Sequence, residues 1–277
     1  MKILNKKILV DTKDTRVTEI DVQAPHIAPK ALPGQFVILM VSEEGERIPL
    51  TVVDKNLSSG TIKLIFQELG FTTQLLGRLN AGDSLYALVG PLGHATQMKD
   101  YGSVIIIGGG VGIAEIFPVA RGLKEAGNNV TTILGARTKE ILILEDELKK
   151  VSDTLLICTD DGSYGKKGFT TNILGDLLIH KPQATSYKLV YAVGPIPMME
   201  RVAGITKEHG VSTLVSLNAL MVDATGMCGC CRVKIGDEVK FSCVDGPEFD
   251  AHIVDWDELK KRTSKYQDKE AHICKLL

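Results

Sequence analysis

Four of the six cysteines gather within sixteen residues, at Cys228, Cys230, Cys231 and Cys243. A disulfide framework would spread its cysteines through a short secreted chain, whereas clustered cysteines in a cytosolic chain favour a metal site. The remaining cysteines, Cys158 and Cys274, stand alone. We expect both to be structural, because free cysteine is among the most buried residue types.

The spacing of the clustered cysteines follows an iron–sulfur pattern. Plant-type [2Fe–2S] ferredoxins use C-x4-C-x2-C with a distant fourth cysteine. When that spacing is laid backward from the last two positions, the first ligand falls on Asp223, whose carboxylate oxygen can bind iron. The predicted ligands are therefore Asp223, Cys228, Cys231 and Cys243, and Cys230 is a spare thiol beside them.

Two other interpretations of this segment stay open. Zinc could be held by the four cysteines alone, although the adjacent Cys230 and Cys231 point apart and rarely close on one tetrahedral ion. Alternatively, Asp223 is a surface carboxylate and water completes the site.

A glycine-rich loop, Gly108-Gly109-Gly110-Val111-Gly112, follows the apolar run that begins at Val104. Glycine lets the backbone approach a phosphate, and a helix N-terminus offers free N–H groups to it. The spacing departs from G-x-G-x-x-G, and the next apolar run ends at Arg137 instead of an acidic residue that grips a ribose. A tight strand–helix turn without a ligand is the alternative.

Two later loops strengthen the nucleotide interpretation. Asp160 follows the third apolar run of this region, and Gly194-Pro195 follows the fourth. All three loops would then lie at the carboxyl ends of parallel strands, where open α/β sheets bind ligands. Gly, Pro and Asp are equally suited to ordinary turns.

Two N-terminal segments could bind phosphates. The segment Arg47-Ile48-Pro49-Leu50-Thr51 opens a strand, and the planar donor fork of an arginine can pin a pyrophosphate. The segment Gly70-Phe71-Thr72-Thr73 precedes a helix, whose N-terminus could hold the same phosphates. Taken alone, a surface arginine and an ordinary helix cap explain these residues better.

Two kinds of secondary structure position these residues. Up to residue 98, short runs rich in β-branched and aromatic residues alternate with turn residues, which predicts an antiparallel barrel or sandwich with one helix over Thr72–Leu79. From Ser103, continuous apolar strands alternate with amphipathic helices, which predicts a parallel sheet between helix layers. The expected strands are Val104–Ile107, Val130–Leu134, Thr154–Cys158, Leu189–Val193 and Thr213–Leu217, and the expected helices are Ala114–Ala126, Lys139–Val151, Thr171–Ile179 and Pro197–His209.

The C-terminal part adds short strands around RVKIG and EVKFSCV, and a charged helix from Asp257. The sequence thus predicts a multidomain β plus α/β protein. Its parts are an antiparallel β-barrel over residues 1–98, a parallel-sheet α/β domain over 99–218, and a small cysteine-rich domain with a C-terminal helix over 219–277.

Composition excludes several classes of protein. The 277 residues are 44% hydrophobic and 24% charged with a formal net charge of −2, which rules out a disordered chain and a basic nucleic-acid binder. No apolar run approaches the ~20 residues that span a bilayer, and the N-terminus lacks a signal-peptide core. We therefore expect a cytoplasmic protein with no membrane and no nucleic-acid partner.

The order of these motifs resembles the ferredoxin–NADP reductase superfamily. Within it, the chain resembles the branch of dihydroorotate dehydrogenase electron-transfer subunits, and most of all the small subunits of NADH-dependent reduced ferredoxin:NADP oxidoreductases, also called sulfide dehydrogenase subunits. The specific motifs are MVDATGMCGCCRV and CVDGPEFDAHIVDWDEL, supported by GGGVGIAEIFPVARGLKEAG, TDDGSYGKKGFTT and VGPIPMM. Dihydroorotate dehydrogenase subunits usually have cysteine where this chain has Asp223, which favours the second group.

The resemblance implies a cofactor for each domain. The barrel is expected to bind FAD, the α/β domain NAD(H), and the small domain a [2Fe–2S] cluster. The FAD residues implied are Arg47, Pro49, Leu50 and Thr51, in place of the family's R-x-Y-S, with Gly70, Thr72 and Thr73 as the phosphate turn. The nicotinamide-nucleotide residues implied are Gly108, Gly109, Gly110, Gly112, Asp160, Gly194 and Pro195. The family's usual cysteine before the last Gly-Pro is Val193 here.

The function implied is an electron relay between NAD(H), FAD and the cluster, with no catalytic acid or base required of the protein. Electrons would pass to or from a larger flavin and iron–sulfur subunit that reacts with ferredoxin and NADP in an electron-bifurcating enzyme. Two alternatives remain: a dihydroorotate dehydrogenase electron-transfer subunit, and a zinc-stabilised nucleotide-binding regulator without redox activity. NADH is the expected nucleotide, although Arg137 could accept the 2′-phosphate of NADPH.

Overall fold

A computed structural model of the chain describes residues 1–180 and 187–265. They form two compact units. The first contains residues 1–95, 218–247 and the described residues from Asp255 onward, and the second contains residues 96–217 and 248–254. The three domains that the sequence predicts, with boundaries at residues 98 and 218, are defined by the cofactor that each is expected to bind. Those boundaries stay a prediction.

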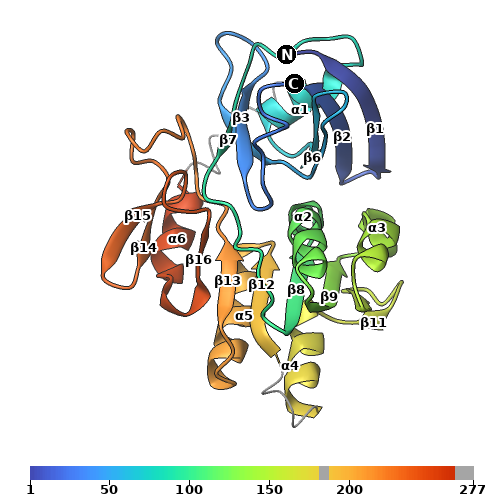
Figure 1. Cartoon of the computed structure of the whole chain (residues 1–277), viewed down its shortest axis with the longest axis vertical. Coiled ribbons are helices and arrows are strands. Elements are labelled where there is room, and N and C mark those ends of the chain that lie inside the picture. Colours follow the sequence, from blue (N-terminus) through green and yellow to red (C-terminus); the bar gives the residue numbers. More distant parts are fainter. Residues whose placement is uncertain (181–186, 266–277) are drawn as a thin grey trace. The chain divides into compact units, whose positions relative to one another are not determined.

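Two antiparallel sheets make up the N-terminal part of the first unit (Figure 1). One has the order β1-β2-β6-β5 and the other β4-β3-β7. The bounds are β1 Ile3–Asp11, β2 Arg16–Gln23, β3 Phe36–Met40, β4 Ile48–Thr51, β5 Asp54–Asn56, β6 Thr61–Gln67 and β7 Ala87–Leu92, with helix α1 at Phe71–Arg78. Strands β1 and β2 form an antiparallel hairpin. In the turn between them, the Thr12 hydroxyl accepts the Thr15 N–H at 3.1 Å.

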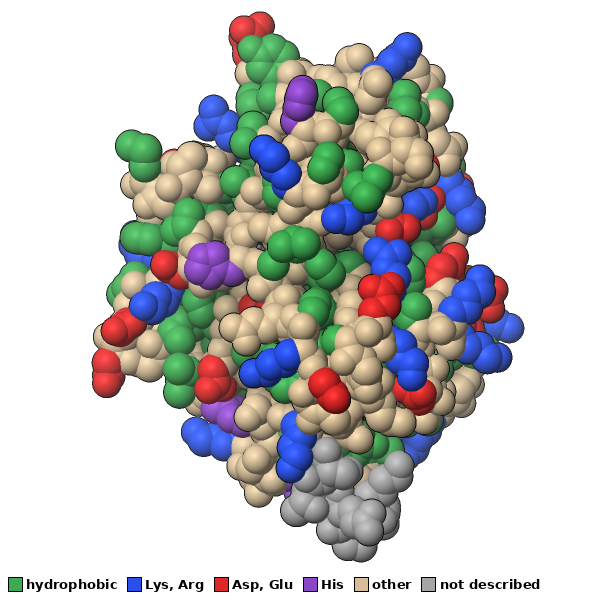
Figure 2. All heavy atoms as spheres, in the orientation of Figure 1, with side chains coloured by type: hydrophobic (Ala, Val, Ile, Leu, Met, Phe, Trp, Pro, Cys, Tyr) green, Lys and Arg blue, Asp and Glu red, His purple; other side chains and the backbone are tan. Residues whose placement is uncertain are grey.

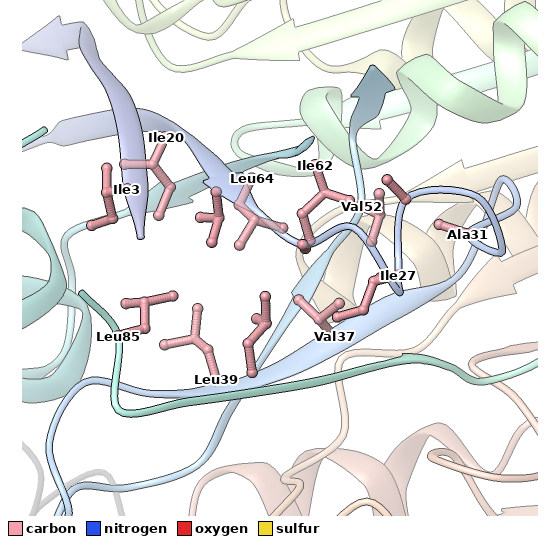
Figure 3. Close-up of a cluster of buried hydrophobic side chains, with 14 of the residues drawn as sticks. Ile3, Ile20, Ile27, Ala31, Val37, Leu39, Val52, Ile62, Leu64 and Leu85 are labelled. Carbon is pink, nitrogen blue, oxygen red and sulfur yellow. The ribbon is translucent and has the colours of Figure 1, made fainter. Parts of the chain in front are cut away.

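The core of this part lies between its two sheets. Figure 3 shows Ile3, Ile20 and Leu64 facing Leu85 and Leu39 across it. All five side chains are buried, and full burial of one such side chain stabilises a fold by roughly 1.5–3 kcal/mol. The side chains that point into this core occupy one face of each strand. Only the opposite face of each strand is therefore available for binding.

A seven-stranded sheet forms the centre of the second unit, in the order β11-β10-β9-β8-β12-β13-β16. Strands β10, β9, β8, β12 and β13 are parallel, as the continuous apolar runs predict. The strand bounds are β8 Ser103–Gly109, β9 Asn129–Ala136, β10 Thr154–Thr159, β11 Lys166–Lys167, β12 Tyr187–Val193, β13 Thr213–Ser216 and β16 Glu248–Asp250.

Helices cover this sheet in two layers. Helix α2 packs on β8 and β9 and contacts α3. Helices α4 and α5 pack together; α4 contacts β9 and β10, and α5 contacts β12 and β13. The bounds are α2 Gly112–Glu125, α3 Glu145–Lys150, α4 Thr170–His180 and α5 Ile196–Glu208. From β8 the chain first adds β9 and β10 towards one edge of the sheet, and it then crosses back to add β12 and β13 towards the other edge. Right-handed crossovers therefore place the two pairs of helices on opposite faces.

One expectation about this unit is wrong, and one of its strands was not expected from the sequence. The predicted helix over residues 139–151 is broken into a 3-10 turn, η1 Lys139–Ile141, and the short helix α3, because Leu144 has a φ of 55° that no α-helix tolerates. Strand β16 was not predicted; it pairs antiparallel with β13, and a second 3-10 turn, η3 Ala251–Ile253, follows it.

The cysteine segment is held by a hairpin and a helix. Strands β14 Arg232–Ile235 and β15 Glu238–Phe241 pair antiparallel, and helix α6 Trp256–Thr263 packs on β14. This confirms two short strands and the start of the predicted charged helix. The helix ends at Thr263, earlier than predicted, with Ser264 as its C-cap residue. Residues 266–270 of the predicted helix and Cys274 lie outside the described residues.

The surface mixes both charge signs. Figure 2 shows lysine and arginine side chains interspersed with aspartate and glutamate on the face drawn. Among residues 1–180 and 187–265, no helix has both the length and the apolar composition needed to cross a bilayer.

Candidate functional site

The cysteine loop brings two of the predicted ligands into direct contact. The Sγ atoms of Cys231 and Cys243 lie 3.1 Å apart, and both side chains are buried as free thiols. Burial, reinforced by the hydrogen bond from Cys231, raises the pKa of Cys243 to about 12. Because a metal binds the thiolate, a metal at this pair must displace the thiol protons.

The other two predicted ligands form a second pair. The Asp223 carboxylate accepts the Thr225 N–H at 2.9 Å and the Cys228 N–H at 3.2 Å. These hydrogen bonds, Thr225 first, hold the pKa of Asp223 below its usual value. The carboxylate is thus charged and turned back onto the loop beside Cys228.

The backbone of this loop is unusual. Ala224, Gly226 and Gly229 all have positive φ, at 58°, 82° and 66°. The left-handed conformation costs alanine roughly 1–2 kcal/mol, and a residue other than glycine adopts it only where the surrounding structure imposes it. These three residues lie between Asp223 and Cys231, so the left-handed turns fall within the segment that carries three of the predicted ligands.

The contacts among the predicted ligands suit a two-iron cluster. Among the residues that the structure describes, no group of three or more His, Cys, Asp or Glu side chains is arranged to hold a metal ion. The Cys231 and Cys243 thiols are in contact, and the Asp223 carboxylate accepts the backbone N–H of Cys228. These contacts group the predicted ligands in twos, and each iron of a [2Fe–2S] cluster takes two protein ligands.

Two arginines contact this loop that sequence reasoning did not single out. Arg232 Nη1 donates to the Gly229 carbonyl at 3.4 Å, and Arg262 Nη2 donates to the Cys230 carbonyl at 3.0 Å. Arg262 lies in α6, thirty-two residues beyond its acceptor, so no local pattern could have indicated it.

The two predicted phosphate segments of the barrel lie side by side. The Thr72 hydroxyl donates to the Glu46 carboxylate, which brings the residue before Arg47 to the first turn of α1. The Thr73 hydroxyl accepts the Gly70 N–H at 3.0 Å and so closes the cap of that helix. Glu46 is a contact that the sequence did not suggest.

Strand β4, which carries Pro49, Leu50 and Thr51, is the edge strand of its sheet. Proline belongs on an edge because it has no N–H to give to a further strand. The departure of Pro49 from the family's R-x-Y-S pattern is therefore compatible with the position of the strand.

In the α/β unit, the glycine loop and Gly194-Pro195 meet at the point where the strand order reverses. They follow β8 and β12, neighbouring strands from which the chain proceeds in opposite directions. In open α/β sheets this crevice is the usual ligand site. A Cβ on Gly112 would lie 2.6 Å from the Val193 carbonyl oxygen, and one on Gly194 would lie 3.2 Å from Gly109 Cα, so the two loops touch backbone to backbone.

The glycines of this loop have different tasks. A Cβ on Gly108 would meet the backbone at Ile113 Cα at 2.9 Å, and one on Gly109 would displace the Met198 side chain, whose Sδ would lie at 2.5 Å, so both glycines serve packing. Gly110 has a φ of 58° and no heavy atom within 4 Å of an added Cβ. Within this loop, Gly110 offers the open backbone that a phosphate could approach.

Asp160 lies two strands from the glycine loop, where its N–H donates to the Ala136 carbonyl at 3.1 Å. Burial raises its pKa, and the neighbouring Arg137 opposes that rise. The charges of these two residues thus meet at the carboxyl ends of β9 and β10. Cys158, expected to be structural, is buried in β10, and burial raises its pKa to about 11.

Comparisons with known proteins agree with the cluster segment. A family profile described as the iron–sulfur cluster binding domain of dihydroorotate dehydrogenase B matches residues 218–255. That range contains all four predicted ligands and both strands of the hairpin.

Two comparisons cover nearly the whole chain. A Thermotoga maritima protein named as a homologue of the dihydroorotate dehydrogenase B (NAD(+)) electron transfer subunit is 47% identical over 249 residues, 90% of this chain and 86% of that protein. A chain from the structure of an NADH-dependent reduced ferredoxin–NADP oxidoreductase, studied for flavin-based electron bifurcation, is 45% identical with a TM-score of 0.90, covering 98% of this chain and 95% of that one.

A more distant likeness concerns the fold alone. Ferredoxin–NADP+ reductase from Plasmodium falciparum is 16% identical with a TM-score of 0.60, over 75% of this chain and 89% of that one.

Proposed function

Because this chain belongs to the family of dihydroorotate dehydrogenase B electron-transfer subunits and their homologues, we propose that it carries electrons between NAD(H), FAD and a [2Fe–2S] cluster for a larger partner subunit. FAD supplies the exchange between two-electron and one-electron chemistry, and the cluster accepts single electrons. The protein contributes binding, orientation and electrostatics.

The observation that carries this proposal is the pairing of ligands in the cysteine loop. Asp223 and Cys228 would hold one iron, and Cys231 and Cys243 the other. Cys230 lies between the pairs in sequence, and we assign it no iron. One backbone N–H of this loop donates to sulfur in the structure, from Cys230 to Cys228 Sγ at 3.5 Å.

FAD would be held by the edge strand β4 and the first turn of α1. The Thr72–Glu46 hydrogen bond supports this assignment, because it joins the residue that precedes Arg47 in the sequence to the first turn of α1. A guanidinium and a helix N-terminus both favour a pyrophosphate. Pro49, Leu50 and Thr51 would lie along the flavin, and Gly70, the N-cap residue of α1, would lie beside the phosphates.

The nicotinamide nucleotide would bind where β8 and β12 end. Gly110 leaves room for a phosphate, and Gly112 and Gly194 let the two loops approach each other. Asp160 would accept hydrogen bonds from ribose hydroxyls. Val193 leaves no thiol at the end of β12, so the protein offers no side-chain acid there.

The partner we propose is a larger flavin and iron–sulfur subunit that reacts with ferredoxin and NADP. The 45% identity to a chain of an NADH-dependent reduced ferredoxin–NADP oxidoreductase supports it. Asp223 favours it over a dihydroorotate dehydrogenase, whose subunits usually have cysteine at that position. The names of several relatives keep dihydroorotate oxidation as the second candidate.

Purification of the native complex distinguishes these two functions. The chain would be tagged in its own host, isolated under nitrogen with its partner, and assayed for two reactions. We expect NADP reduction that requires both NADH and reduced ferredoxin. Dihydroorotate-dependent reduction of NAD without that activity would assign the chain to dihydroorotate dehydrogenase instead.

A further inference from the structure

Two consecutive carbonyl groups of the cysteine loop are held from outside the loop. The Gly229 carbonyl accepts from Arg232, and the Cys230 carbonyl accepts from Arg262. These are the two peptide groups immediately before Cys231, a predicted iron ligand. Arginine suits this task because its charge is permanent and its donors are fixed in a plane.

Holding a carbonyl determines where the next N–H points. A trans peptide is planar, with its C=O and N–H on opposite sides. The Gly229 carbonyl faces Arg232, and the Cys230 N–H on the other side of that plane reaches Cys228 Sγ at 3.5 Å. By the same geometry, the Cys231 N–H faces away from Arg262.

Helix α6 is fixed in a way that delivers Arg262 to this carbonyl. Its first turn is tied to β14, because the Asp255 N–H donates to the Lys234 carbonyl at 2.9 Å and the two side chains pair at 3.4 Å. Leu259, one turn later, is buried. Arg262 then lies in the last turn, so the helix is anchored along its length between β14 and the cysteine loop.

We propose that Arg262 is a positioning residue for the [2Fe–2S] cluster, which orients the peptide before Cys231 and raises the cluster's reduction potential. This inference rests on the proposed function, since it requires that the loop hold a cluster. Reduction adds a negative charge, which a nearby fixed positive charge stabilises. Hydrogen bonds to sulfur and local charge are two of the determinants of the potential of such clusters.

The charge of Arg262 lies beside the loop, because its Nη2 is 3.0 Å from the Cys230 carbonyl oxygen. The neighbouring Lys261 is exposed on the same helical turn and has no hydrogen bond to the loop among the described contacts. Lys261 therefore provides a control with the same charge change on the same element.

The test compares three variants of the purified, cluster-containing chain or complex by a redox titration followed by electron paramagnetic resonance. Arg262→Gln removes the charge, and we expect about a tenfold lower affinity of the cluster for its electron, a shift of about −59 mV for a one-electron couple. Arg262→Lys retains the charge but loses the planar donors, so its potential should stay closer to the wild-type value. Lys261→Gln should match the wild type.

A second readout is the rate at which a chelator removes iron from the oxidised protein. Both Arg262 variants should lose iron faster than Lys261→Gln, because the peptide before Cys231 is no longer held. If Arg262→Gln loses its cluster during purification while Lys261→Gln keeps it, the positioning role is supported, and Arg262→Lys reports the potential.

Identical potentials and iron-release rates in Arg262→Gln and Lys261→Gln would overturn the inference while the proposed function stands. A wild-type chain that holds no iron and no sulfide would instead overturn the proposed function itself.

Discussion

Gly112→Ala tests whether the two loops at the reversal of strand order must touch. An added Cβ would lie 2.6 Å from the Val193 carbonyl oxygen, 2.8 Å from its carbonyl carbon and 3.0 Å from the Gly194 nitrogen. All three atoms belong to backbone, so no side-chain rotation relieves the contact, and the loops must separate by several tenths of an ångström. Overpacking of this kind costs roughly 1–3 kcal/mol.

The same displacement should weaken the binding of NADH, since the crevice is built from these two loops. If all of that cost appears in binding, the dissociation constant rises by roughly 5- to 150-fold, because every 1.4 kcal/mol is a factor of ten. The assays are isothermal titration with NADH and thermal unfolding, and the melting temperature should fall by several degrees.

Gly204→Ala in α5 is the matched control. An added Cβ there has no heavy atom within 4 Å, and alanine is the better helix former, so this variant should be more stable by roughly 0.5–1 kcal/mol. A Gly112→Ala protein with the melting temperature and NADH affinity of the wild type would refute the close-approach reasoning.

Three further predictions concern a buried carboxylate, nucleotide choice and the cluster ligands. Burial raises the pKa of Glu248, whose carboxylate accepts hydrogen bonds from Thr96 and Tyr191. The folded state therefore holds the Glu248 proton more tightly than the unfolded state does. The contribution of Glu248 to stability falls as the pH rises from the pKa of the unfolded state through the higher pKa of the folded state. The stability of Glu248→Gln relative to the wild type should therefore increase from pH 4 to pH 8 in thermal unfolding; a constant difference would contradict this. NADH should outperform NADPH in a steady-state diaphorase assay, and a clear NADPH preference would point to Arg137 as a 2′-phosphate ligand. Asp223→Cys should keep the cluster but change its electron paramagnetic resonance, because oxygen is a harder ligand than thiolate, and Cys230→Ser should leave the spectrum unchanged; the reverse pattern would make Cys230 the fourth ligand.

The parallel sheet could be predicted because each of its strands has a distinct sequence signature. Val104–Ile107 is a continuous apolar run, and Val130–Leu134 consists of apolar and β-branched residues, as expected of strands buried on both faces; both are strands in the structure. The glycine loop could be found for a similar reason, because a close approach of backbones leaves glycine as the residue that fits.

The elements that could not be predicted depend on tertiary contacts. Residues 139–151 have the apolar spacing of a helix, but the left-handed conformation of Leu144 ends it, and leucine carries no signal for that conformation. Strand β16 has three residues, too few for a periodic pattern, and it exists because β13 has an edge to pair with.

In the candidate site, too, the residues in one short segment could be predicted from the sequence, whereas the contacts between distant residues could not. Ferredoxin spacing led to Asp223, Cys228, Cys231 and Cys243, since all four lie in one short segment. The contacts of Glu46 with Thr72 and of Arg262 with Cys230 join residues 26 and 32 positions apart, and no spacing rule connects them.

The most direct test of the electron-transfer function is an analysis of cofactor content. The chain would be purified under nitrogen, and iron, acid-labile sulfide, zinc and flavin would be measured per chain alongside the visible spectrum. The account predicts one FAD with two iron and two sulfide per chain, as a [2Fe–2S] cluster requires, and both flavin and iron–sulfur absorption. A colourless chain that contains zinc and no flavin would contradict it.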